Sequence, residues 1–99
     1  MIYSVELTAR ASRDLRQIYS TISAADSQQA RVWLNGLEAA VLSLREHPAR
    51  SPIIPEDGRL RHLLYANKRH VYRIIFALDE AAQVVTVLHI QHGSCEPLS

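Results

Sequence analysis

Basic side chains gather in the last third of the chain, where they could hold a phosphate or another anion. Between residues 57 and 76 a single acidic residue, Asp57, stands against five basic residues: Arg59, Arg61, Lys68, Arg69 and Arg73. A local excess of positive charge favours an acidic partner or a polyanion. We therefore predict that these five residues bind a target or a polyanion.

Arg73 is the most unusual of the five, because it lies inside the apolar run Tyr72-Arg73-Ile74-Ile75-Phe76. A guanidinium stays charged and is costly to bury without a partner, so it should face solvent, a binding partner or a polyanion. An ion pair with Glu56, Glu80 or a partner's carboxylate is an equally good interpretation.

The histidines of the same region could in principle hold a metal ion. They are His62, His70, His89 and His92, and their spacing matches no ligand motif. We therefore expect neither a metal nor a cofactor. His92 precedes a glycine at a predicted strand end, where a histidine is more often a hydrogen-bonded turn residue than a base.

The chain has 99 residues, of which 47% are hydrophobic and 21% charged. A chain this short supports one core, so we predict one domain, residues 1–99, with the composition of a soluble protein. No segment approaches the roughly 18 apolar residues of a membrane helix. The single cysteine, Cys95, excludes an intramolecular disulfide and suits a reducing compartment, so we expect a cytoplasmic protein without membrane contact.

The apolar periodicity predicts the elements that position the basic residues. Tyr3, Val5 and Leu7 alternate with polar residues as in a short strand. Two amphipathic helices follow, one after Thr8 and one ending before Pro48, and the short connection between them predicts a helical hairpin. Residues 48–58 contain three prolines and are expected to form a surface loop.

Three further strands are predicted at residues 60–65, 71–78 and 84–90, as an antiparallel meander. The order β-α-α-β-β-β predicts an α+β fold in which the helical hairpin packs on one face of a small, mainly antiparallel four-stranded sheet. Alternation places Tyr72, Ile74, Phe76 and Leu78 on the core face and Arg73 on the opposite face. The neighbours expected for Arg73 are Arg61 and either His89 or His92.

Three short motifs in this order resemble the RelE/ParE superfamily of toxins from type II toxin–antitoxin modules. They are Gly58-x-Leu60-Arg61, Tyr72-Arg73-Ile74-Ile75-Phe76 and Val85-x-Val87-Leu88-x-Ile90-x-His92-Gly93. The resemblance covers essentially the whole chain and implies a toxin that a cognate antitoxin neutralises. RelE-like members cleave messenger RNA in the ribosome, whereas ParE-like members poison DNA gyrase.

The tail of the chain favours the ParE-like branch. In RelE-like enzymes an arginine matching Arg73 serves the phosphate, a basic residue follows the glycine aligned with Gly93, and a tyrosine lies beyond. Residues 94–99, Ser-Cys-Glu-Pro-Leu-Ser, contain neither of the last two. A ribonuclease would have to rely on Arg61, Arg73 and His92 as its catalytic residues.

The resemblance thus favours a gyrase inhibitor that is not an enzyme. The alternatives are a RelE-like, ribosome-dependent, metal-independent mRNA endoribonuclease and a degenerate homologue that binds an antitoxin without being toxic. Trp33, Leu37 and Val41, on the stripe of the second helix, are either core residues or part of the groove that receives the antitoxin. A homodimer or a toxin–antitoxin hetero-oligomer is the expected assembly.

Overall fold

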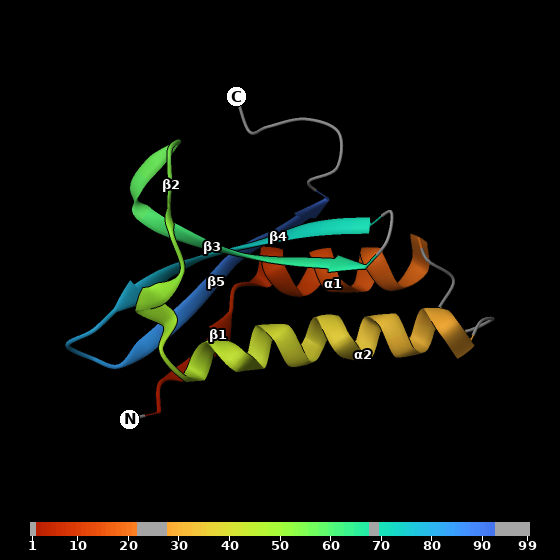
Figure 1. Cartoon of the computed structure of the whole chain (residues 1–99), viewed down its shortest axis with the longest axis horizontal. Coiled ribbons are helices and arrows are strands. Elements are labelled where there is room, and N and C mark those ends of the chain that lie inside the picture. Colours follow the sequence, from red (N-terminus) through yellow and green to blue (C-terminus); the bar gives the residue numbers. More distant parts are fainter. Residues whose placement is uncertain (1, 22–27, 68–69, 93–99) are drawn as a thin grey trace.

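A five-stranded sheet is the framework of the protein (Figure 1). The computed structural model describes residues 2–21, 28–67 and 70–92. Its strands lie in the order β1-β5-β4-β3-β2, and β1 runs parallel to β5 while the other neighbours are antiparallel. They are β1 (Ser4–Leu7), β2 (Ile53–Ile54), β3 (Asp57–Asn67), β4 (His70–Asp79) and β5 (Val84–His92).

The mixed α+β class and the antiparallel meander of β3, β4 and β5 confirm the sequence prediction, but the predicted four-stranded sheet is wrong by one strand. The fifth strand, β2, forms inside the segment that was expected to be a loop. It spans two residues and lies between Pro52 and Pro55. Because proline has no N–H to donate to a neighbouring strand, a ladder flanked by two prolines stays short.

Two helices lie on one face of the sheet (Figure 1). They are α1 (Ala9–Thr21) and α2 (Gln28–Leu42), and the short 3-10 helices η1 (Ser43–Arg45) and η2 (Pro48–Arg50) follow. α1 packs mainly against β5 and α2 against β3. The predicted hairpin therefore differs in detail, because each helix packs on its own strand.

Thr8 ties the start of α1 to β5. Its hydroxyl oxygen accepts the N–H of Ala11 at 3.1 Å, as an N-cap residue does, and its O–H donates to the carbonyl of Leu88 at 3.1 Å. The backbone N–H of Thr8 also donates to the carbonyl of Val87 at 3.0 Å. These bonds direct α1 along β5, where β1 has ended.

The main core lies between the helices and the sheet. Its fully buried members include Leu37 of α2, Ile74 and Phe76 of β4, and Val85 and Val87 of β5, all 0% exposed. This confirms the predicted core face of the strand around Phe76. No described helix is long and apolar enough to cross a membrane.

The other face of the sheet, here called the outer face, has a small covered region of its own. Ile75 of β4 and Ile54 of β2 are buried, 4% and 3% exposed, yet neither belongs to the main core. Figure 1 shows the β2–β3 hairpin curling to the side of the sheet away from α1 and α2. Residues 52–58, here called the arm, thus cover part of the outer face.

Candidate functional site

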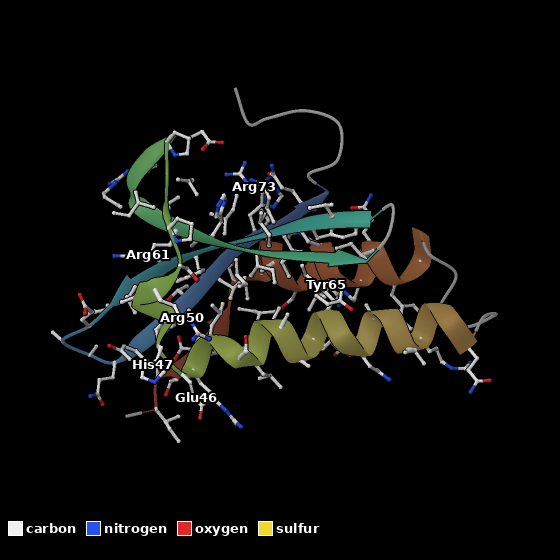
Figure 2. All side chains as sticks on the ribbon, in the orientation of Figure 1. Glu46, His47, Arg50, Arg61, Tyr65 and Arg73 are labelled. Carbon is white, nitrogen blue, oxygen red and sulfur yellow. The ribbon has the colours of Figure 1, made fainter. Side chains whose placement is uncertain are left out.

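Arg73 lies on the outer face, as the alternation along β4 predicted, but it is not open to solvent. It is only 9% exposed. Its Nη1 and Nη2 donate to the two carboxylate oxygens of Glu56 in the arm, at 3.1 and 3.4 Å. Figure 2 shows Arg73 on the opposite side of the sheet from α2, whereas Tyr65 lies between β3 and α2. Of the interpretations drawn from the sequence, the structure confirms the ion pair with Glu56.

His62 of β3 completes this cluster. The Nε of Arg73 donates to Nδ1 of His62 at 3.1 Å, so this ring nitrogen carries no proton. Burial lowers the pKa of His62 below its ordinary value of 6.5, and the charge of Arg73 lowers it further against a weaker opposing effect of Glu56. The hydrogen bond from Arg73 likewise lowers the pKa of Glu56. Near neutral pH the cluster is therefore a guanidinium, a carboxylate and a neutral imidazole.

Arg61 does not join Arg73, contrary to the expectation. It lies opposite Phe76 in the strand register, which places it on the helix face of the sheet. Its Nη1 donates to the carbonyls of Ala49 and Ser51, at 3.0 and 2.6 Å. Arg61 thus holds the segment that leads into β2, and its guanidinium serves the fold.

Arg59 is the remaining predicted anion-binding residue that the structure describes. Arg59 projects into solvent, with its side chain 88% exposed, and pairs with Asp57 at 2.9 Å. The hydrogen bond from Arg59 lowers the pKa of Asp57. Lys68 and Arg69 lie outside the described residues. The three described members of the set, Arg59, Arg61 and Arg73, do not form one patch, since their guanidinium groups bind at three different places.

Of the two candidate histidines of β5, only the side chain of His89 is described, and it contacts Asp14 rather than Arg73. In the register, Arg73 pairs with Gln91, whereas His92 pairs with Tyr72 and its side chain lies outside the described structure. His89 contacts Asp14 of α1 instead, with Nδ1 and Oδ2 2.6 Å apart. We find no cluster of three or more potential metal ligands among the described side chains.

Asp14 is a site residue that the sequence analysis did not single out. Besides contacting His89, its Oδ2 accepts the backbone N–H of Ile90 at 3.0 Å. β1 pairs with β5 only as far as Val87. Beyond this residue Asp14 accepts a hydrogen bond from the edge of β5 that β1 leaves unpaired. The sequence feature that could have identified Asp14 is that it is the one acidic residue on α1, whose other charged residues are Arg10, Arg13 and Arg16.

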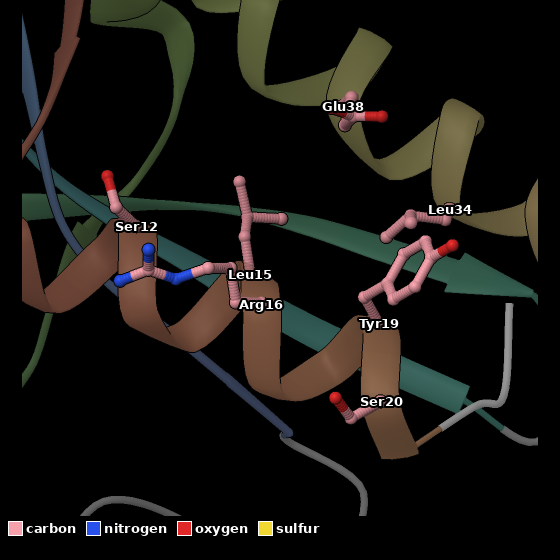
Figure 3. A pocket seen from close by; sticks show the side chains of 7 residues that line it. All are labelled: Ser12, Leu15, Arg16, Tyr19, Ser20, Leu34 and Glu38. Atoms are coloured by element: carbon pink, nitrogen blue, oxygen red, sulfur yellow. The ribbon is translucent and has the colours of Figure 1, made fainter. Parts of the chain in front are cut away.

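A groove between α1 and α2 is the second candidate site (Figure 3). Its volume is about 530 Å³, and it is lined by Ser12, Leu15, Arg16, Tyr19, Ser20, Leu34 and Glu38. Tyr19 of α1 points toward Leu34 of α2 in Figure 3. The Tyr19 side chain contributes an exposed apolar surface, because the residue is 41% exposed.

Leu37 and Val41, two of the residues expected to contact an antitoxin, do not line this groove. Leu37 and Val41 belong to the core and are 0% and 3% exposed. Trp33 is part of α2, but its side chain lies outside the described structure. A contact of Leu37 or Val41 with an antitoxin stays a prediction, and it would require α2 to move away from the sheet.

Comparison with known proteins places the chain among toxins. The family described as "ParE toxin of type II toxin-antitoxin system, parDE" matches residues 5–97. No match was found among curated protein sequences.

Three solved structures illustrate the likeness in fold. A chain of the chromosomal ParDE system from P. aeruginosa is 18% identical, with a TM-score of 0.72, over 92% of this chain and 96% of that one. A chain of the toxin–antitoxin complex RelBE2 from Mycobacterium tuberculosis is 24% identical, with a TM-score of 0.64, over 94% and 100%. A mutant of the E. coli toxin RelE in the free state is 17% identical, with a TM-score of 0.62, over 91% and 82%.

Proposed function

Because this chain belongs to the ParE toxin family of type II toxin–antitoxin systems, we propose that it is a toxin that inhibits DNA gyrase by binding it, without catalytic chemistry. An antitoxin neutralises it in the cytoplasm. We choose gyrase over RNA because the guanidinium groups of Arg61 and Arg73, the candidate catalytic arginines, are already bound within the fold.

A metal-free ribonuclease needs basic groups that are free to surround one phosphate and a group that transfers a proton. Arg73 is buried and its two terminal nitrogens face Glu56. Arg61 is bound to backbone carbonyls on the other face. The two predicted catalytic arginines therefore offer no pair of free cations around one point, which supports a toxin that acts by binding.

The similar structures support an antitoxin partner. The P. aeruginosa protein belongs to a ParDE system and the M. tuberculosis structure is a toxin–antitoxin complex. A further similar structure, of an E. coli RelE mutant with an antitoxin RelBc peptide, has a TM-score of 0.50 and 17% identity. We assign the antitoxin to the groove between α1 and α2, whose apolar members are Leu15, Tyr19 and Leu34. Trp33, Leu37 and Val41 remain further candidates.

Of the predicted target-binding residues that the structure describes, Arg59 is best placed to contact gyrase, because its side chain is 88% exposed. Lys68 and Arg69 remain proposed target-binding residues, as the sequence predicted. The complex of toxin and antitoxin is a hetero-oligomer in this proposal, and the free toxin covers its groove by forming a homodimer.

The test compares two activities of one purified preparation. The protein should block supercoiling of plasmid DNA by gyrase and leave ribosome-bound mRNA intact. Arg59→Gln should weaken the inhibition, whereas Arg50→Gln, which changes another exposed arginine on η2, should not. Cleaved mRNA, lost in Arg73→Lys, would establish the ribonuclease alternative. Inhibition of neither process would identify a degenerate homologue that only binds its antitoxin.

A further inference from the structure

Glu56 contacts Arg73 in the manner of a bound ligand. Both terminal nitrogens of the guanidinium face both oxygens of the carboxylate, the two-pronged geometry with which arginine recognises carboxylates. Seventeen residues separate the two along the chain. The side chain of Arg73 is 11% exposed and that of Glu56 is 25% exposed, so the carboxylate reaches Arg73 from the solvent side.

The arm that carries Glu56 is attached at its base and open at its tip. At the base, Ile54 is buried and the carbonyl of Pro52 accepts the N–H of His62 at 3.1 Å. At the tip, a side chain added at Gly58 would meet no atom within 4 Å. The Asp57–Arg59 pair beside it lies within the arm and its continuation into β3. Glu56 can therefore leave Arg73 by a movement of the tip, while the base stays in place.

The surroundings of Arg73 suit one carboxylate better than a chain of phosphates. His62 is neutral near pH 7, because burial and the charge of Arg73 lower its pKa. Arg59 is engaged with Asp57 and Arg61 with backbone carbonyls. Within this cluster of described side chains Arg73 is thus the one full positive charge, and the exposed Arg59 near the tip of the arm adds a single further one, whereas nucleic-acid binding relies on several cations.

An apolar side chain lies directly beside Arg73 on the same face. Leu64 of β3 is its cross-strand partner and is 54% exposed. Partners in this position have their Cβ atoms about 5 Å apart, so one ligand can touch both side chains. A phosphate backbone gains little from an exposed leucine, whereas a protein segment with acidic and apolar residues matches both features.

We propose that Arg73 and His62 form a carboxylate-binding site on the outer face, that Glu56 is its internal ligand, and that an acidic, partly apolar protein segment takes the place of Glu56. The incoming carboxylate binds Arg73 and a neighbouring apolar side chain packs on Leu64. The arm then acts as a competitor, because the site is available only in the fraction of molecules in which Glu56 has left. This site is separate from the groove between the helices and does not depend on gyrase as the target.

The experiment measures the binding of a short fluorescent peptide of alternating leucine and glutamate to the purified full chain by fluorescence anisotropy. Glu56→Gln removes the competing charge, and we expect it to tighten binding about tenfold if the wild-type site is open about a tenth of the time. Asp57→Asn is the matched control, since it removes a neighbouring carboxylate of the same arm that does not contact Arg73, and it should bind as the wild type does. Adding Arg73→Gln to Glu56→Gln should abolish the gain.

The proposal would be overturned by equal affinities of Glu56→Gln and the wild type, by an equal gain in Asp57→Asn, or by an equal gain for the leucine–glutamine counterpart of the peptide. A larger gain for a single-stranded oligonucleotide would identify a nucleic-acid site instead and would equally reject it.

If Glu56→Gln does not fold, a second measurement tests whether the peptide displaces Glu56. In the wild type, an excess of the acidic peptide should release the arm and speed hydrogen exchange at the N–H of Arg59, which now donates to Asp57 at 2.9 Å. Exchange that stays unchanged while the peptide binds would place the peptide elsewhere. Leu64→Ser should weaken this binding, and because Leu64 is exposed the substitution should leave the fold intact.

Discussion

The two faces of the sheet bury their residues by different means. On the helix face, α1 and α2 cover an apolar surface, and the buried residues of β4 there are Tyr72, Ile74 and Phe76. On the outer face, the seven-residue arm covers part of the same strand, and the buried residues are Arg73 and Ile75. Apolar burial needs no particular partner, whereas a buried guanidinium needs a specific acceptor. The comparison shows that one strand can serve an apolar core on one side and a buried ion pair on the other.

The sharpest test of this difference uses two adjacent isoleucines on opposite faces of β4. Ile74 is 0% exposed under the helices and Ile75 is 4% exposed on the outer face. We expect Ile74→Ala to lower the free energy of unfolding by about 4 kcal/mol and Ile75→Ala by about 2 kcal/mol, because the arm can collapse into the space left and the helices cannot. Urea denaturation measures both. Equal losses would show that the arm is packed as rigidly as the core.

The close approach of α2 to the sheet gives the next largest effect. A methyl group at Gly36 would overlap the hydroxyl of Tyr65 on β3. We expect Gly36→Ala to destabilise the fold by about 1–2 kcal/mol in thermal unfolding, since overpacking exceeds the gain of about 1 kcal/mol in helix propensity. Tyr65→Phe in the same chain should recover part of the loss. Stabilisation by Gly36→Ala alone would mean that α2 can shift freely over the helix face.

The loss of thermal stability on removing a carboxylate of the arm should depend on which carboxylate is removed. Glu56→Ala leaves the buried guanidinium of Arg73 without its carboxylate partner, whereas Asp57→Ala removes only the partner of the exposed Arg59. We therefore expect Glu56→Ala to lower the melting temperature by several degrees and Asp57→Ala to change it little. A loss of the same size in both variants would indicate that the arm contributes by its charge alone.

The pH dependence of stability should come from the outer face. The lowered pKa of His62 means that the unfolded chain takes up a proton more readily below pH 6.5, so the stabilisation is complete above this value and is lost as the pH falls through the folded pKa. The lowered pKa of Glu56 acts in the same direction below pH 4.5. Urea denaturation over this range measures the effect. His62→Asn, which keeps an acceptor for Arg73, should flatten the upper part of the profile, and an unchanged profile would contradict the assignment.

The smallest effect is expected at a position that belongs to neither face. Gln83, before β5, has a φ of 59°, in the left-handed region. Glycine adopts this conformation without the side-chain strain, so Gln83→Gly should stabilise the protein by up to about 1 kcal/mol. Since Gln83 lies outside α1, α2 and the arm, the ratio of the losses at Ile74 and Ile75 should stay the same in this background.

Local patterns in the sequence were sufficient to predict most of the fold. The alternation along residues 71–78 predicted the core face, because successive side chains of a strand point to opposite sides. The three strands of the meander followed from apolar runs separated by polar connections. The short strand β2 escaped this reasoning, since two residues between prolines have no periodicity and pair only because β3 extends past them.

The candidate site was harder to predict. Glu56 was among three possible partners of Arg73, and only the return of the chain over the outer face selected it. Arg61 was expected beside Arg73, but its position in the register assigned it to the other face and to the carbonyls of Ala49 and Ser51. Asp14 and His89 are 75 residues apart, and no local pattern connects them.

The amino-acid sequence by itself determined the class of fold, the core face of β4 and the family to which the chain belongs, because these depend on periodicity and on the order of elements. Only the tertiary structure decided which charges are free. A guanidinium such as that of Arg73 takes the nearest acceptor, and which acceptor is nearest depends on contacts between segments that are distant along the chain.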